Sequence, residues 1–143
     1  MIEVISILEV LLQLSMLLMM GLYFIFSNTL MPVLSRQKGG ADTMIAINKV
    51  ILNPLFMAGF IVSGLAGLYY FISFSGAKSL AGVVFFLGTT LVTVLFNVPL
   101  NNKLRDASEL NKAAVWELYL KKWVFWNHVR TLCAVLSGFL LLA

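Results

Sequence analysis

Four long apolar runs set the strongest limit on how this chain can fold. They extend over about Val4–Phe26, Leu55–Phe74, Leu80–Phe96 and Val124–Ala143. Each comes close to the roughly 20 residues that a helix needs to cross a hydrocarbon core of about 30 Å. Because backbone groups in lipid must pair within their own segment, such runs form helices rather than open strands. The sequence therefore predicts an all-α bundle of four transmembrane helices, built as a single domain over residues 1–143.

Composition and charge indicate where this bundle resides and how it is oriented. Of the residues, 61% are hydrophobic and 11% are charged, which is far from a soluble domain. Every Lys and Arg residue except Lys78 lies in or beside the loops that follow the first and third runs. We therefore expect a multi-pass protein of the cell membrane, surrounded by the lipid bilayer, with both basic loops cytoplasmic and both termini outside. Because acidic residues are interspersed among these cations, we expect no nucleic-acid partner.

The three prolines lie where the predicted spans meet the cytoplasmic side. Proline lacks an N–H and disfavours helix in the residue before it. We therefore expect Pro32 and Pro99 to end the first and third spans, and Pro54 to lie in the first turn of the second span.

Each cytoplasmic loop also carries a pattern typical of a short amphipathic helix. Residues Thr43–Leu52 alternate apolar and polar side chains at helical spacing. In the second loop, Asp106 and Glu109 resemble a capping box, and apolar residues continue at helical spacing as far as Tyr119. The sequence predicts one short amphipathic helix in each loop.

Polar side chains from three of the predicted helices share one depth near the cytoplasmic side. They are Asn53, Asn97, Asn101, Asn127, His128 and Arg130. Polar groups in a membrane usually face the bundle interior and mark sites, so the sequence predicts a polar pocket at this depth. A purely structural role, in which the asparagines cap helix ends, stays open for each residue alone.

An aromatic stripe leads into the last span. One helix face carries side chains that recur every three or four residues, namely Trp116, Tyr119, Trp123, Trp126 and Arg130, and Asn127 and Thr131 adjoin it. Such residues either anchor a helix at the membrane interface or form a flat wall for a planar aromatic ligand. Both interpretations fit the spacing.

His128 is the single histidine, and burial in a membrane favours its neutral form, which can accept a proton. The alternative is a packing histidine bonded to a neighbouring asparagine. His128 and Cys133 lie on different faces of the helix, so the chain offers no zinc or copper site of its own. A haem held by His128 as a single axial ligand stays open, although we expect no cofactor.

Small residues form one face of the second span. Gly59, Ser63, Gly64 and Gly67 allow a close approach by another helix, either within the subunit or in a homo-oligomer.

Three sequence elements together resemble a known family. They are Asn48-Lys-Val-Ile-Leu-Asn-Pro-Leu-Phe56, Asn97-Val-Pro-Leu-Asn-Asn102, and the segment from Trp116 to Trp126-Asn-His-Val-Arg-Thr131. The chain is similar over nearly its whole length to the anthrone-oxygenase-like family of small four-span membrane proteins. The resemblance implies that the protein oxidises a small lipophilic aromatic of the anthrone type with dioxygen and without an evident cofactor.

On this basis the sequence suggests a role for each polar residue. His128 would be the general base, and Asn97, Asn127 and Arg130 would stabilise the oxyanion. The substrate-binding residues would be Trp116, Tyr119, Trp123, Trp126, Asn53, Asn101 and Thr131. The alternative function is a non-enzymatic membrane protein that binds a lipid, a quinone or a haem, or that serves as an assembly partner.

Overall fold

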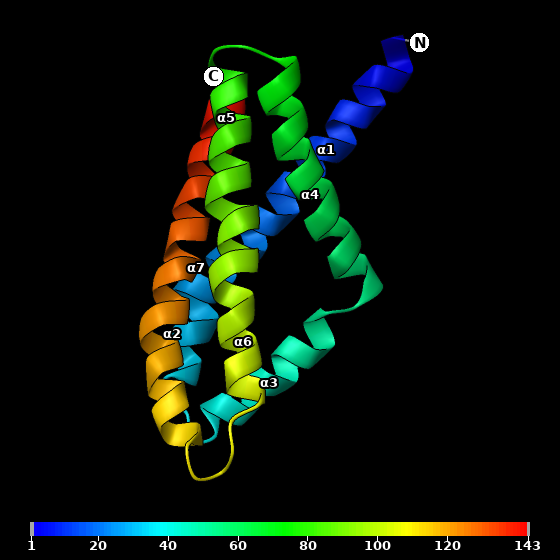
Figure 1. The fold of residues 1–143 in the computed structure, drawn as a ribbon. Coiled ribbons are helices and arrows are strands. Elements are labelled where there is room, and N and C mark those ends of the chain that lie inside the picture. The colour runs from blue at the N-terminus through cyan, green and yellow to red at the C-terminus, as the bar shows by residue number, and fades with distance from the viewer. Residues whose placement is uncertain (1, 143) are drawn as a thin grey trace.

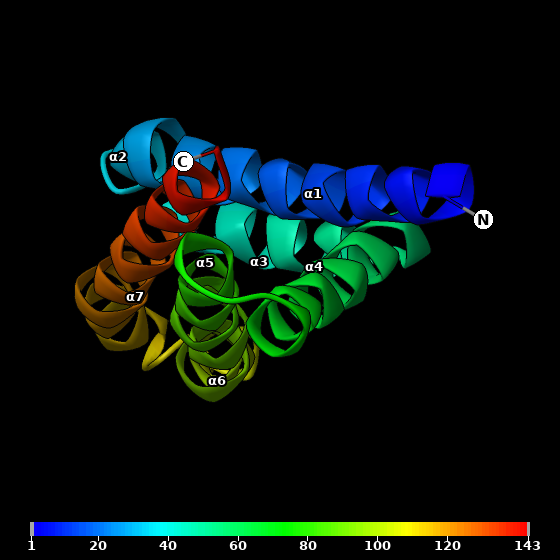
Figure 2. The same cartoon turned by 90° about the horizontal axis from the view of Figure 1, so that it is seen from above.

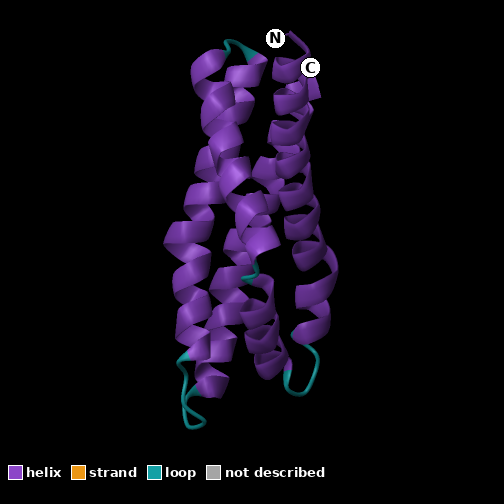
Figure 3. Ribbon diagram, turned by 90° about the vertical axis from the view of Figure 1, so that its right-hand side faces the viewer, coloured by secondary structure: helices purple, strands orange, loops and turns teal. Residues whose placement is uncertain are grey.

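The computed structural model describes residues 2–142, with side chains from Ile7 onward, and this part of the chain contains helices and loops but no strand (Figure 3). The elements are α1 (Ile2–Ile25), η1 (Phe26–Leu30), α2 (Met31–Leu34), α3 (Gly40–Ile51), α4 (Pro54–Ser73), α5 (Ala77–Phe85), η2 (Phe86–Leu91), η3 (Thr93–Asn97), α6 (Val98–Arg105) and α7 (Lys112–Leu142). The label η marks π-helical turns.

Several of these elements join end to end, so that four long apolar helices form the bundle. Those long enough to cross a membrane are Ile7–Leu34, Pro54–Ser73, Ala77–Arg105 and Lys112–Leu142. Seen from above, α1, α4, α5 and α7 form a ring in which each contacts two neighbours (Figure 2). The two ends of the chain lie at one end of the bundle, and α3 and the loop before α7 lie toward the other (Figure 1). The predicted all-α four-helix bundle is confirmed.

The prolines at the ends of spans one and three do not end their helices. The first helix continues past Pro32 to Leu34, and the third continues past Pro99 to Arg105. In a regular α-helix each proline ring would clash with the carbonyl group four residues earlier. That carbonyl belongs to Asn28 for Pro32 and to Leu95 for Pro99, and both residues lie inside a π turn. The wider π turn accommodates the proline ring, so the predicted ends at Phe26 and Phe96 are wrong. Pro54 does begin α4, as predicted.

The two polar loops differ from each other. The first contains the predicted amphipathic helix, α3, which buries Met44 completely. The second contains no separate helix, because Asp106–Asn111 forms turns and α7 then runs without a break for 31 residues. Asp106 pairs with Arg105 instead of capping a helix, so the predicted capping box is wrong. The predicted end of the last span, Ala143, lies outside the described residues.

Small residues let α4 and α5 approach closely. A methyl group on Gly82 would overlap the Gly67 carbonyl oxygen and would lie 2.5 Å from the Phe71 nitrogen. Ser63 and Gly64 are also buried, and Gly64 lies against Thr90. The small-residue face of the second span is therefore used mainly for packing inside the subunit.

This packing predicts different outcomes for two glycines. Gly82→Ala should destabilise the bundle by about 1–3 kcal/mol, because the new methyl group overlaps backbone atoms. Gly59→Ala is the matched control on α4, since nothing lies within 4 Å of the position that its methyl group would take, and it should be neutral or stabilising. Thermal unfolding in detergent compares the two variants, and equal melting temperatures would contradict the close contact.

The fold and the charge pattern also predict which loops face the cytoplasm. Gln37 and Ser108 are exposed in the two loops that lie away from the chain ends. In a Cys133→Ala background, cysteines placed at these positions should react with a membrane-impermeant thiol reagent only after the membrane is opened. Labelling of intact cells at either position would reverse the orientation.

Candidate functional site

A cavity of about 550 Å³ lies between α1, α3, α6 and α7, in the half of the bundle away from the chain ends. Apolar side chains of α1, η1 and α3, including Leu22, Phe26 and Met44, supply part of its wall. The side chains with polar atoms are Tyr23, Asn48, Lys49, Thr93, Asn97, Asn101, Asn102, Arg105, Trp123 and Arg130. Its volume falls in the range of small-molecule sites, roughly 300–1,000 Å³.

Arg130 supplies the charge at the inner part of this cavity. Its side chain projects from α7 and is only 6% exposed. Nη1 donates a hydrogen bond to the Thr93 hydroxyl at 3.1 Å, and Nη2 donates to Oδ1 of Asn127 at 2.5 Å. The guanidinium carbon lies 4.5 Å from the centre of the Tyr23 ring and 5.3 Å from that of Trp123. Two neutral acceptors and two aromatic faces therefore hold the cation in place.

Among the side chains that the structure describes, no carboxylate balances the charge of Arg130. The ion pairs in the described part of the chain all involve other residues, and no Asp or Glu lines the cavity. A buried cation without an ion pair is costly, because desolvation is only partly offset by neutral hydrogen bonds. This arrangement favours an anion, or an oxygen that becomes negative, inside the cavity.

Asn127 fixes the orientation of this guanidinium. Its amide nitrogen donates to the Tyr23 carbonyl oxygen at 3.2 Å and to the Ser27 hydroxyl at 2.7 Å. The amide oxygen must then face Arg130. Thr131 extends the network, since its hydroxyl donates to the Asn127 carbonyl oxygen at 2.9 Å and lies 2.8 Å from the Ser27 hydroxyl.

The π turns bring the partners of α7 to this depth. Ser27 lies in η1, and Thr93 and Asn97 lie at the two ends of η3. The Thr93 hydroxyl donates to the Thr89 carbonyl oxygen at 2.7 Å, which leaves a lone pair for Arg130. The turns that accommodate Pro32 and Pro99 thus also place polar side chains beside the cation, a common setting for π turns at functional sites.

Several buried polar atoms of the lining have no hydrogen-bond partner within the described residues. They are the Tyr23 hydroxyl, Asn48 Nδ2, Asn97 Oδ1, Trp123 Nε1 and Arg130 Nε. Such atoms are rare in folded proteins because each one costs free energy. Their shared position around one cavity indicates a ligand that accepts hydrogen bonds and also donates at least one.

The structure brings four of the predicted site residues to the cavity wall. Asn97, Asn101, Trp123 and Arg130 line it. Asn97 donates to the Trp123 carbonyl oxygen at 3.3 Å, and Asn101 accepts from the Tyr119 hydroxyl at 2.8 Å. Asn127 lies behind the wall and reaches the cavity only through Arg130.

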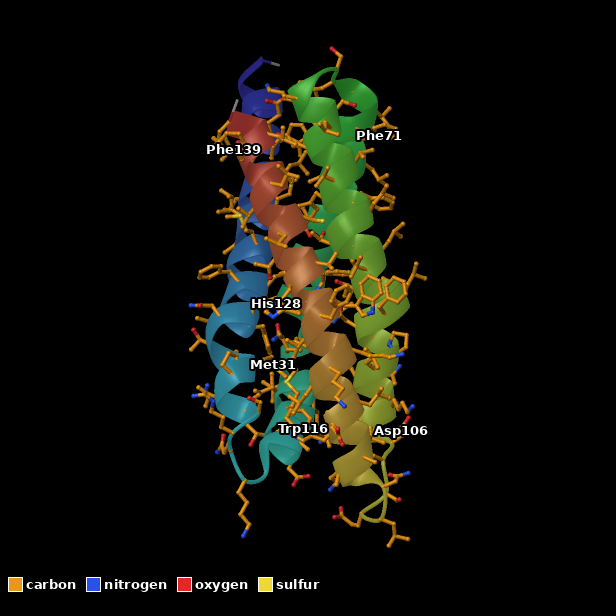
Figure 4. The ribbon with its side chains drawn as sticks, turned by 90° about the vertical axis from the view of Figure 1, so that its left-hand side faces the viewer. Met31, Phe71, Asp106, Trp116, His128 and Phe139 are labelled. Atoms are coloured by element: carbon orange, nitrogen blue, oxygen red, sulfur yellow. The ribbon has the colours of Figure 1, made fainter. Side chains whose placement is uncertain are left out.

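The predicted convergence of His128 on this pocket is wrong. His128 is exposed on the outer surface of α7, and it is absent from the cavity wall. Figure 4 places it between the level of Phe139 and that of Trp116. Successive residues of an α-helix are rotated by about 100° about its axis. Because Asn127 faces the interior, the next residue, His128, points outward. His128 is therefore not positioned to act as a base, or to bind haem iron, within this cavity.

Other predicted binding residues lie outside the cavity and have structural roles. Asn53 is exposed and caps α4 by accepting from the Phe56 nitrogen at 3.0 Å. Trp126 stacks on Phe96 with ring centres 3.9 Å apart, outside the cavity. Trp116, Tyr119 and Thr131 also lie outside the wall; the first two stack in series on Trp123. The aromatic stripe is thus mostly core packing.

Some lining residues were not predicted. Tyr23 and Phe26 lie in the first apolar run, where nothing in the pattern sets them apart. Thr93 resembles any threonine in a span. Asn48 and Lys49 were recognised as the polar face of an amphipathic helix and as the start of a family motif, but not as part of the pocket.

The fold and the cavity define a small helical membrane protein of four spans, with an uncompensated cation in a cavity between its helices. A family model described as Anthrone oxygenase matches residues 42–140. The chain belongs to the anthrone oxygenase family, which confirms the resemblance seen in the sequence. The match includes Asn48, Asn97 and Arg130 but leaves out α1. A search of curated proteins and a search of solved structures each return no significant match.

The hydrogen bonds of Asn127 predict a large effect of its removal. Asn127→Leu should lower the free energy of unfolding by about 1–3 kcal/mol, since it removes the acceptor of Arg130 Nη2 and one of the two side-chain partners of the Ser27 hydroxyl. His128→Leu changes the adjacent, exposed position and should stay within about 0.5 kcal/mol of the unmodified protein. Denaturant or thermal unfolding in detergent measures both, and a greater loss in His128→Leu would contradict the assignment.

Proposed function

We propose that the cavity binds a flat lipophilic aromatic ketone of the anthrone type as its enolate, and that the bound anion is oxidised by dioxygen. Family membership supports the type of reaction. The single observation that carries the proposal is the Arg130 guanidinium, which is buried beside the cavity without a carboxylate partner.

The chemistry asks little of the protein apart from charge stabilisation. An anthrone loses a proton from its methylene carbon to give an electron-rich enolate. The enolate passes electrons to O₂, and a new C–O bond forms a hydroperoxide on the same carbon. Loss of the remaining hydrogen on that carbon, with cleavage of the O–O bond, gives a ketone and water. The sum is R₂CH₂ + O₂ → R₂C=O + H₂O, in which the methylene carbon is oxidised and dioxygen is reduced.

Arg130 takes the central role in this proposal. An opposite charge close to the substrate oxygen stabilises the enolate and lowers the pKa of the methylene group. No His, Asp or Glu lines the cavity, so the methylene proton passes to water at the cavity mouth rather than to a side chain. Asn127 acts as a positioning residue, because it holds Nη2 and leaves Nε of Arg130 free for the ligand.

The remaining lining residues suit an aromatic ring with oxygen substituents. Tyr23, Phe26 and Trp123 supply aromatic surface. The rings of Phe26 and Trp123 pack edge to face, with their centres 5.7 Å apart. Trp123 Nε1 can donate to a ligand oxygen, and Asn97 Oδ1 can accept from a ligand hydroxyl. A hydroxylated tricyclic ketone satisfies both groups at once.

This proposal predicts opposite outcomes for two residues of α7 that lie two positions apart. With purified protein in detergent and an anthrone as substrate, Arg130→Gln should lower oxygen uptake by about 10²–10³-fold, as expected for loss of an oxyanion partner. His128→Ala should keep its turnover within about twofold, because the side chain lies outside the cavity.

The reverse pattern, with loss of turnover in His128→Ala alone, would contradict the role of Arg130. Binding of anthrone or quinone by the unmodified protein without any oxygen uptake would instead favour the alternative of a non-enzymatic binding protein.

A further inference from the structure

The mouth of the cavity is built by α3 and α6 and carries positive charge. Asn48 and Lys49 come from the last turns of α3, and Asn102 and Arg105 come from α6. All four line the cavity, and no lining residue is acidic. The cavity therefore has cations both at its inner part, from Arg130, and at its mouth.

The acidic residues of this end of the molecule are already paired. Asp106 accepts from Arg105 at 2.8 and 3.1 Å, and this hydrogen bonding lowers the pKa of the Asp106 carboxyl. Lys112 binds Asp42 and Glu109. Figure 4 shows Asp106 near the level of Trp116, at the end opposite Phe139. Lys49 forms no ion pair with any described residue, so it keeps an unbalanced charge at the mouth.

A cytoplasmic lysine alone has an ordinary explanation in membrane orientation. The amide of Asn48 provides an independent observation. Its nitrogen is buried and forms no hydrogen bond of good geometry with a described residue, although the Tyr119 hydroxyl is close, and the residue lines the cavity next to Lys49. A buried donor beside an unpaired cation matches the recognition of an anionic oxygen, because it adds a directed hydrogen bond to the charge.

We propose that Asn48 and Lys49 form a subsite for an anionic substituent, and that the preferred ligands of the cavity are lipophilic aromatic acids. The ring lies in the cavity beside Arg130, Tyr23 and Trp123, and a carboxylate or a similar oxyanion lies at the mouth. This inference rests on the proposed function for the position of the ring. It adds a specificity determinant at a distance from Arg130, on a different helix.

Two probes that differ in charge and by one methyl group test the subsite. They are anthraquinone-2-carboxylate and its methyl ester, and binding to the protein in a nonionic detergent is followed by quenching of tryptophan fluorescence. The unmodified protein should bind the carboxylate about two- to fivefold more tightly than the ester, the ratio expected for one charge contact with an exposed lysine. Lys49→Met keeps an unbranched side chain only one atom shorter and should bring the ratio close to one, with ester binding unchanged.

Matched variants separate the subsite from general electrostatics. Lys38→Met removes an exposed loop cation that does not line the cavity, and it should keep the full preference for the carboxylate. Asn48→Ala should weaken binding of the carboxylate more than binding of the ester. An equal loss of preference in Lys38→Met and Lys49→Met would overturn the subsite.

Two further outcomes distinguish this inference from the proposed function. Equal binding of both probes by the unmodified protein would overturn the subsite and leave the ring site intact. Binding of neither probe would overturn both proposals. A preference for the carboxylate that is lost in Arg130→Gln but kept in Lys49→Met would place the anion at the inner cation and would also overturn the subsite.

Discussion

The arrangement around the cavity depends on one buried cation that has no anionic partner. Arg130 lies in the interior of a four-span bundle, where a guanidinium loses most of its hydration. Asn127, Thr93 and two aromatic rings offset part of this cost. They do so without neutralising the charge, so the interior keeps a positive potential that a ligand can use. A buried charge that lowers the stability of the fold is typical of ligand-binding and catalytic sites.

The first and third helices are irregular at the depth of Arg130, and their prolines explain why. In an uninterrupted α-helix the rings of Pro32 and Pro99 would clash with the carbonyl groups of Asn28 and Leu95, one turn earlier. The π turns Phe26–Leu30 and Thr93–Asn97 remove this clash and allow each helix to continue past its proline. They also contain Ser27 and Thr93, which contact Asn127 and Arg130 respectively. Backbone irregularity and polar network are thus two parts of one feature.

The sequence predicted the fold well and the site only in part. Apolar run length and charge bias depend on local composition, so four helices, the α3 amphipathic helix and the shared end of both termini followed directly. The side on which His128 points depends on the helix rotation that buries Asn127, and spacing alone does not set this rotation. Asn53 was assigned to the pocket because it lies at the same predicted depth in the membrane, but its side chain caps α4. Tyr23 and Thr93 can be recognised as lining residues only from the packed structure, because neither residue type is unusual in a membrane span.

The central claim is that Arg130 stabilises a negative oxygen on a bound aromatic ligand. The most direct measurement is a spectrophotometric titration of 1,8-dihydroxyanthraquinone, a coloured compound whose phenol ionises without further reaction, bound to the protein in nonionic detergent. The account predicts that the pKa of the bound phenol is about one to three units below its value in empty micelles. It also predicts that Arg130→Gln removes most of this decrease. A bound phenol with an unchanged or raised pKa in the unmodified protein would contradict the account.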